Sequence, residues 1–190
     1  MKVLWLARLA SILCMVCLFV GNVWAKDQIL LKEFAIYLEK KPERLVANIQ
    51  FDYELNNYLR ESLLNGVTLR SEVRFDVIWY NEWWFNKRER LTTIVTELKY
   101  HALSGHYQLV RKDSNENWNF SSLAAALEHM GKIGLFQLPN VPADVYSGDA
   151  SLFVDAVLEP ESPDLPLNLS SLFLNKHRLV NEGAMWTIPR

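Results

Sequence analysis

The chain has 190 residues, of which 20 are Lys or Arg and 22 are Asp or Glu, so its formal net charge is −2. A balance this mild gives no electrostatic reason to expect nucleic acid as a partner. The length is sufficient for a single domain to bury a core of its own without cross-links.

The N-terminal residues have the pattern of a secretory signal peptide. Lys2 and Arg8 form a basic start, residues 9–20 are almost wholly apolar, and Val23-Trp24-Ala25 resembles a cleavage site. The apolar run is about a dozen residues, whereas a membrane-spanning helix needs roughly 20. We therefore predict cleavage after Ala25.

The predicted organisation is a signal peptide over residues 1–25 and a single α+β domain over residues 26–190. The mature protein is then expected in the periplasm or elsewhere in the envelope. The alternative is an uncleaved N-terminal segment that anchors the chain in the inner membrane. Both cysteines, Cys14 and Cys17, lie in the leader, so the mature chain has no disulfide, catalytic thiolate or Cys-bound zinc.

Two alternating segments follow the leader, over residues 28–39 and 44–52. Apolar side chains recur at every second position in both, which is typical of strands, and Pro42 lies in the turn between them. The period then becomes helical and ends before Asn65-Gly66, so we predict a short helix with Asp52 as its N-cap and Gly66 in the left-handed conformation. The apolar stripe of this helix consists of Leu55, Tyr58, Leu59, Ser62 and Leu63.

Residues 67–111 carry the strongest pattern in the chain and predict a long hairpin that organises the fold. Val73, Phe75 and Val77 alternate with charged residues, which places them on the buried face of an antiparallel strand. A turn-like segment over residues 80–88 follows, and alternation then resumes. Gly105 marks either a bulge in the second arm or a tight turn between two strands.

A second amphipathic helix is predicted from the cap Ser121-Ser122 to Gly131, and a last strand over residues 152–159, with irregular chain around Gly134 between them. This order favours an α+β fold, with a mostly antiparallel β-sheet, a long central hairpin and two short amphipathic helices packed on it. The alternative is a β-sandwich with helical insertions.

Several motifs follow one another along the chain in a fixed order. They are Leu63-Leu64-Asn65-Gly66-Val67-Thr68-Leu69, the Trp-rich hairpin connection, Tyr100-His101-Ala102-Leu103-Ser104 with Tyr107, Ser122-Leu123-Ala124-Ala125-Ala126-Leu127 with Gly131, and Leu165-Pro166-Leu167 before Trp186. Together these motifs resemble the DUF4390 family of exported proteobacterial proteins, and the resemblance covers essentially the whole mature chain. It implies an envelope address without an established activity or catalytic residue. It also implies a gene that often lies beside that of a membrane sensor kinase, so such a kinase is one expected partner.

Candidate catalytic and metal-binding residues are sparse. No Gly-x-Ser-x-Gly nucleophile motif occurs, and helix capping accounts for Ser121 and Ser122. Glu97 and Asp155 are the acids to consider for glycoside hydrolysis, although charge on a solvent face is the simpler interpretation. The histidines show no His-Glu-x-x-His pattern, so no metal or other cofactor is predicted. The histidines are His101, His106, His129 and His177.

The most informative motif is Trp83-Trp84-Phe85 in the predicted hairpin connection, which is followed by Lys87, Arg88 and Arg90. Three adjacent aromatic residues cannot easily all point inward, and exposed aromatic side chains beside cations suit a protein partner or a membrane interface. The alternative is that the sheet curls, or a helix covers this end, so that all three belong to the core.

We therefore expect an exported, non-enzymatic protein that serves as a binding or accessory module for an unknown envelope protein or a membrane surface. The alternative is a periplasmic hydrolase with an unrecognised site. A deep pocket with convergent polar groups would favour the hydrolase, and a shallow aromatic surface would favour the binding module.

Removal of the leader is the first testable prediction. The short apolar run and the small residue at its end predict that protein isolated from the envelope begins at Lys26. Intact-mass measurement distinguishes this species from the full chain, and a product that retains Met1 would contradict the prediction.

Overall fold

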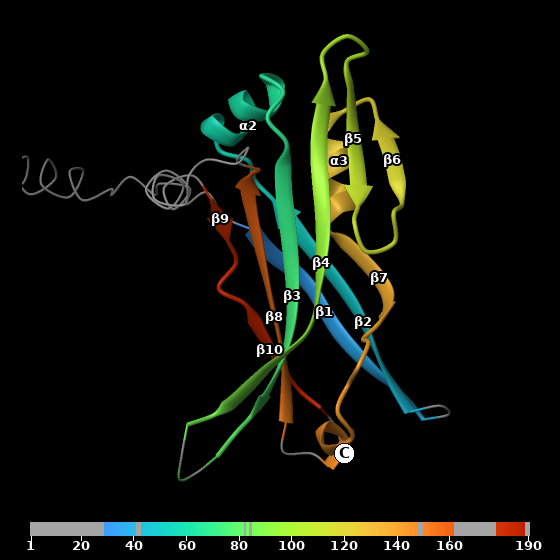
Figure 1. Cartoon of the computed structure of the whole chain (residues 1–190), viewed down its shortest axis with the longest axis vertical. Coiled ribbons are helices and arrows are strands. Elements are labelled where there is room, and N and C mark those ends of the chain that lie inside the picture. Colours follow the sequence, from blue (N-terminus) through green and yellow to red (C-terminus); the bar gives the residue numbers. More distant parts are fainter. Residues whose placement is uncertain are drawn as a thin grey trace, which may run out of the picture.

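The computed structural model describes residues 29–40, 43–81, 83, 85–147, 150–161 and 178–188. Within these ranges the chain forms two antiparallel β-sheets, two α-helices and a short 3-10 helix, which confirms the predicted α+β class. The strands of the smaller sheet run obliquely behind those of the larger one (Figure 1). The leader and its predicted cleavage site lie outside the described residues, as does Pro42.

The larger sheet is built around the predicted hairpin. Strand β3 (Leu69–Trp79) pairs with β4 (Lys87–His101) along one edge and with β8 (Ala150–Pro160) along the other. The strand order is β10-β8-β3-β4-β5-β6, with β9 also paired to β8, so β3 lies in the interior of the sheet. The remaining strands are β5 (His106–Arg111), β6 (Asn117–Phe120), β9 (Leu179–Val180) and β10 (Ala184–Thr187).

The smaller sheet has the order β1-β2-β7, and its first two strands were predicted. Strand β7 was not, because its apolar alternation is interrupted. Two residues of β7, Gly134 and Leu135, lie opposite Asn48 of β2, and Leu135 has a φ of 49°. Such a bulge breaks the period of two on which strand prediction depends. The strands are β1 (Ile29–Lys40), β2 (Glu43–Tyr53) and β7 (Lys132–Gln137).

Helix α2 (Asn57–Leu64) follows β2, and its N-cap is Asn56, whose Oδ1 accepts from the backbone N–H of Leu59 at 2.8 Å. The prediction of Asp52 as the cap was wrong, because Asp52 still belongs to β2 and lies opposite Leu30. Gly66 follows the helix with a φ of 89°, as predicted.

Helix α3 (Leu123–Gly131) begins after the predicted cap, with the N–H of Ala125 donating to Ser122 Oγ at 3.3 Å. At its end, a Cβ on Gly131 would lie 1.9 Å from the carbonyl oxygen of Phe51, so only glycine allows the helix to approach β2 this closely. A 3-10 helix, η1 (Ala143–Ser147), connects β7 towards β8.

The region of Gly105 is a tight turn rather than a bulge. Residues 102–105 connect β4 to β5, Gly105 has a φ of 67°, and His101 lies directly opposite His106 in the paired strands. The positive φ explains why glycine stands at this position.

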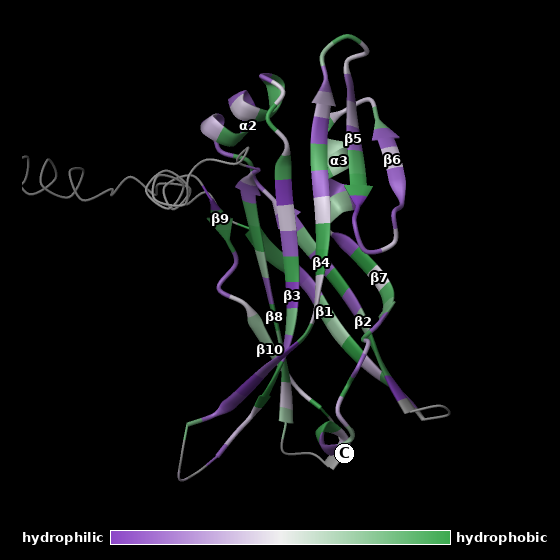
Figure 2. Cartoon of the chain, in the orientation of Figure 1, coloured by the Kyte–Doolittle hydropathy of each residue, from purple (hydrophilic) through white to green (hydrophobic). Residues whose placement is uncertain are grey.

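One core joins the two sheets. Phe75 of β3 stacks on Phe136 of β7 with ring centroids 5.6 Å apart, and Phe34 of β1 meets Trp186 of β10 at 5.8 Å. Hydrophobic and hydrophilic residues alternate along much of β3 and β4 (Figure 2). This alternation is expected of a sheet with one buried and one solvated face.

Replacement of Phe75 tests this arrangement. The side chain is fully buried, so Phe75→Ala should lower the free energy of unfolding by about 3–5 kcal/mol. Leu103→Ala is the control, because Leu103 is fully exposed in the β4–β5 turn and its loss should stay within about ±0.5 kcal/mol. Denaturant melts that show a loss below about 1 kcal/mol for Phe75→Ala would mean that the core face is misassigned.

Candidate functional site

The connection between β3 and β4 projects from the body of the protein as a narrow hairpin (Figure 1). Side-chain amides shape its turn: the N–H of Trp83 donates to Asn81 Oδ1 at 3.0 Å, and the N–H of Asn81 donates to Asn86 Oδ1 at 3.3 Å. Strand β8 begins at Ala150, which pairs with Trp79, the last residue of β3. The connection therefore lies beyond the described pairing of β3 with β8.

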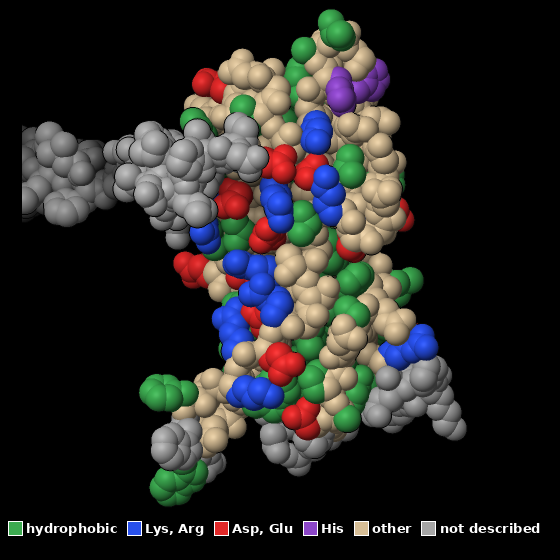
Figure 3. All heavy atoms as spheres, in the orientation of Figure 1, with side chains coloured by type: hydrophobic (Ala, Val, Ile, Leu, Met, Phe, Trp, Pro, Cys, Tyr) green, Lys and Arg blue, Asp and Glu red, His purple; other side chains and the backbone are tan. Residues whose placement is uncertain are grey.

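Aromatic side chains at this connection are in solvent. Trp83 is 86% exposed and Phe85 is 95% exposed, while Tyr80 at the base is 52% exposed. Figure 3 shows hydrophobic side chains at the end of the hairpin, away from the rest of the molecule. Two of the three predicted aromatic contact residues are thus outside the core, and the third, Trp84, lies outside the described residues. We use the term aromatic tip for Tyr80, Trp83 and Phe85.

The cations behind the aromatic tip have partners within the protein. Both Arg88 and Arg90 form ion pairs with Asp76, whose side chain is only 1% exposed. The guanidinium of Arg88 also lies 4.4 Å from the centroid of the Phe153 ring. An ionised carboxylate buried this deeply needs such compensation, so the two arginines stabilise the fold whatever else they contact.

Lys87, the third predicted cation, is less constrained. Its ammonium group lies 3.1 Å from a carboxylate oxygen of Glu89 and 4.3 Å from the centroid of the Trp79 ring. Both members of the ion pair are about half exposed or more, and such pairs contribute little to stability. Lys87 is therefore the cation that a partner can engage without disturbing a buried group.

Further ion pairs line the outward face of the larger sheet, where acidic and basic side chains are interleaved (Figure 3). Arg74 donates two hydrogen bonds to Asp155, of 3.0 and 2.6 Å, and this bonding raises the pKa of Arg74. Glu97 lies 2.7 Å from the ammonium of Lys112 and 3.1 Å from that of Lys99. Burial acts to raise the pKa of Glu97, but the hydrogen bonds from the two lysines outweigh it and hold the pKa below its ordinary value.

Glu97 and Asp155 do not form the acid pair considered for glycoside hydrolysis. Glu97 of β4 pairs with Arg70, and Asp155 of β8 pairs with Arg74. The two acids are therefore on strands either side of β3 and are displaced by four residues along it. That offset corresponds to roughly 16 Å, whereas the two carboxyl groups of a glycosidase lie about 5–9.5 Å apart. Each acid is already neutralised by its neighbours on the sheet.

The histidines also have local partners. His101 Nε2 lies 2.9 Å from Gln108 Oε1, and His106 Nδ1 lies 2.6 Å from the carbonyl oxygen of Ser104. His129 packs against Trp118 and Phe120, and burial lowers its pKa, with a smaller contribution from Arg111. His177 lies outside the described residues. Within the described ranges, no three His, Cys, Asp or Glu side chains gather in a metal-binding group.

The burial of Asp76 was not predicted. Asp76 occupies a polar position of an alternating strand, and that pattern places it in solvent. Its partners come from β4, and their position depends on a bulge between Phe75 and Asp76 in the pairing with β4. The only sign of this ion-pair cluster in the sequence was that Arg88 and Arg90 lie in the hairpin arm facing Asp76.

No helix in the described part of the chain is long and apolar enough to cross a membrane. Comparison with protein-family models matches residues 27–178 to DUF4390, a domain of unknown function. Neither the curated proteins nor the solved structures contain a match to the chain.

The Asp76 cluster can be tested by a double-mutant cycle. Replacing Arg88 and Arg90 together by Gln leaves a buried carboxylate without compensation, which should lower the free energy of unfolding by about 2–3 kcal/mol, near the low end for such sites because the arginines are half exposed. Adding Asp76→Asn to the double variant removes the unpaired charge and should restore much of the loss. Equal stability of the double variant and the parent protein would show that the arginines have no structural role.

Proposed function

The chain belongs to the DUF4390 family, and from that premise we propose that it is an exported, non-enzymatic binding module that docks on a protein of the envelope through the aromatic tip. The observation that carries the proposal is the exposure of Trp83 and Phe85 at the end of a projecting hairpin. Tryptophan and other large aromatic side chains dominate the energetics of protein contacts, and a monomer gains nothing from holding them in water.

The charge around the tip favours a protein over an anionic membrane. Arg88 and Arg90 share Asp76, and Lys87 pairs with Glu89, so three cations face two carboxylates and one net positive charge remains. Membrane attraction of the polybasic kind draws on clusters of about 4–8 free cations. A partner with an apolar pocket needs no such charge, because burial of the aromatic rings supplies the driving force.

Export to the periplasm or envelope is part of the same proposal and is supported by the signal-peptide pattern of residues 1–25. A membrane sensor kinase is the first partner to test, because the family resemblance suggests one. Its extracytoplasmic region would have to present an apolar pocket that accepts the end of a β-hairpin.

Substitutions at the tip test the proposal. Trp83→Ala and Phe85→Ala should each leave the free energy of unfolding within about ±0.5 kcal/mol, because both side chains are in solvent. Each should weaken the partner complex by about 2 kcal/mol or more, or roughly 30-fold, as expected for aromatic residues at the centre of an interface. The measurement is recovery of the partner from envelope fractions, followed by titration of the purified pair.

Leu103→Ala is the matched control, because Leu103 is equally exposed but lies at the opposite end of β4. Partner recovery that survives both tip substitutions, or that falls equally with Leu103→Ala, would contradict the proposal. Lys87→Gln distinguishes a protein partner from a membrane surface. With a protein partner, the affinity of the complex should be nearly unchanged by this substitution. Flotation with anionic vesicles that is weakened by salt, and by about 1 kcal/mol on Lys87→Gln, would show a membrane surface instead.

A further inference from the structure

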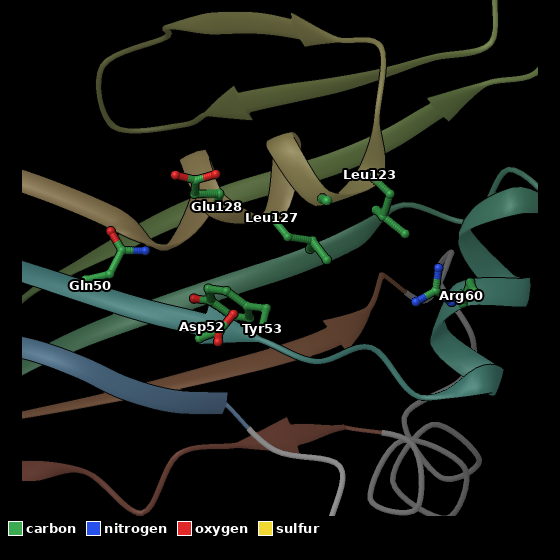
Figure 4. Close-up of a pocket in the computed structure, with 8 residues that line it drawn as sticks. Gln50, Asp52, Tyr53, Arg60, Leu123, Leu127 and Glu128 are labelled. Carbon is green, nitrogen blue, oxygen red and sulfur yellow. The ribbon is translucent and has the colours of Figure 1, made fainter.

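A hollow of about 430 Å³ opens between β2, α2 and α3, on elements that contribute nothing to the aromatic tip. This volume lies in the range of small-molecule sites, which is about 300–1,000 Å³. Figure 4 shows side chains from all three elements around the same space. No sequence pattern pointed to this hollow, because each element contributes only a few of its lining residues.

The middle of the hollow is apolar. Leu123 and Leu127 of α3 line it and are half-buried, and Tyr53 of β2 lines it from below. The Tyr53 hydroxyl is hydrogen-bonded to Ser71 Oγ at 2.8 Å, and burial raises the pKa of Tyr53 to about 12. The phenol therefore stays neutral and engaged with β3. Tyr53 is 4% exposed, so only a small part of its ring forms the floor of the hollow.

The two ends of the hollow carry opposite charges. Arg60 of α2 stands at one end and Glu128 of α3 at the other, with Leu123 and Leu127 between them (Figure 4). Among the described residues, neither Arg60 nor Glu128 forms an ion pair or a side-chain hydrogen bond, whereas Asp52 on the rim pairs with Lys32 at 3.2 Å. Two charges of opposite sign thus face the same hollow without neutralising each other.

The spacing of these charges restricts the ligand. Helix α3 rises about 1.5 Å per residue, so positions 123 and 128 are about 7.5 Å apart along its axis, and Arg60 lies beyond Leu123. A free amino acid carries its ammonium and carboxylate on one carbon and can reach only one end. An extended peptide advances about 3.3–3.6 Å per residue, so at least two or three residues are needed to reach from beside Leu123 to Glu128.

We propose that this hollow binds a short peptide with free termini and an apolar side chain. The peptide carboxylate pairs with Arg60, its ammonium group pairs with Glu128, and the apolar side chain packs on Leu123, Leu127 and the ring of Tyr53. Charged chain ends are a recurrent basis for peptide recognition, and they fix orientation here because the two ends of the hollow differ in sign. This site does not depend on the docking function proposed for the aromatic tip.

The test is a titration of the protein with the tripeptide Ala-Leu-Ala, followed by chemical shifts of backbone amides in α2, α3 and β2. Saturable shifts in these elements are expected. Amidation of the carboxylate, or acetylation of the amino group, should each weaken binding by about fivefold, the upper range for a partly exposed ion pair. Arg60→Gln should match the effect of amidation and Glu128→Gln that of acetylation, and each variant should show no further loss with the peptide that lacks the corresponding charge.

Glu61→Gln is the matched control, because Glu61 lies beside Arg60 on α2 but does not line the hollow. It should leave the affinity unchanged, and thermal melts should show that all three variants remain folded, since the altered side chains are exposed. The proposal is overturned if no saturable shifts appear at millimolar peptide, if the blocked peptides bind as well as the free one, or if Glu61→Gln has the same effect as the variants at the rim.

Discussion

Strand β3 is paired along both edges and buried on one face, and the rest of the structure depends on this position. Its backbone groups are satisfied by β4 and β8 over the full length of the strand. Its inward side chains, with Phe75 at their centre, need apolar cover that β4 and β8 cannot supply, because those strands lie in the same plane. The smaller sheet provides the cover through Phe136. The aromatic tip follows from the same geometry, because in the described part of the chain the pairing of β3 with β8 ends at Trp79 and Ala150, before the tip begins.

The outward face of the larger sheet is organised by one extra residue. Thr92 lies opposite Phe75 on the core side, and in a regular ladder Leu91 would then lie opposite Asp76 and Arg90 opposite Val77. The bulge removes Leu91 from the pairing, which brings Arg90 opposite Asp76 and keeps Arg88 on the same outward side. One extra residue thus replaces an unfavourable Leu91–Asp76 pair by ion pairs between Asp76 and two arginines. Because the buried Asp76 carboxylate needs these partners, it in turn favours this register of β4 over adjacent registers.

Sequence patterns predicted the elements whose signal is local. The alternation around Phe75, the Ser122 cap and the glycine after α2 each depend on neighbouring residues, and each was confirmed. The errors arose where distant strands decide the outcome. Strand β7 forms through its pairing with β2 despite a bulge at Leu135. The burial of Asp76 depends on the bulge in β4 that brings Arg90 opposite it.

The same distinction applies to the candidate sites. The exposed aromatic residues were one of two alternatives that the sequence offered, because three adjacent aromatic residues in a hairpin connection cannot easily all point inward. The exposure of Trp83 and Phe85 in the structure favours this alternative over a covered core. The hollow could not be found from sequence, since Arg60 and Glu128 are separated by 68 positions in the chain (128 − 60) and look like ordinary polar residues on the outer faces of two amphipathic helices. Only the packing of α3 against β2, which the absence of a side chain at Gly131 permits, brings the helices to opposite sides of one space.

The charged groups of this protein differ in how far neighbouring side chains neutralise them. On the outward sheet face, the acids at positions 76, 97 and 155 are each buried and compensated, so that face is internally balanced and offers little to a ligand. Around the hollow, by contrast, opposite charges remain apart on two rigid helices, and at the tip aromatic rings remain in water. The floor of the hollow is tied to β3 by the hydrogen bond between Tyr53 and Ser71, and the tip extends from the other end of the same strand. The two proposed sites therefore lie towards opposite ends of one well-packed strand, and we expect that a ligand in the hollow would not obstruct a partner at the tip.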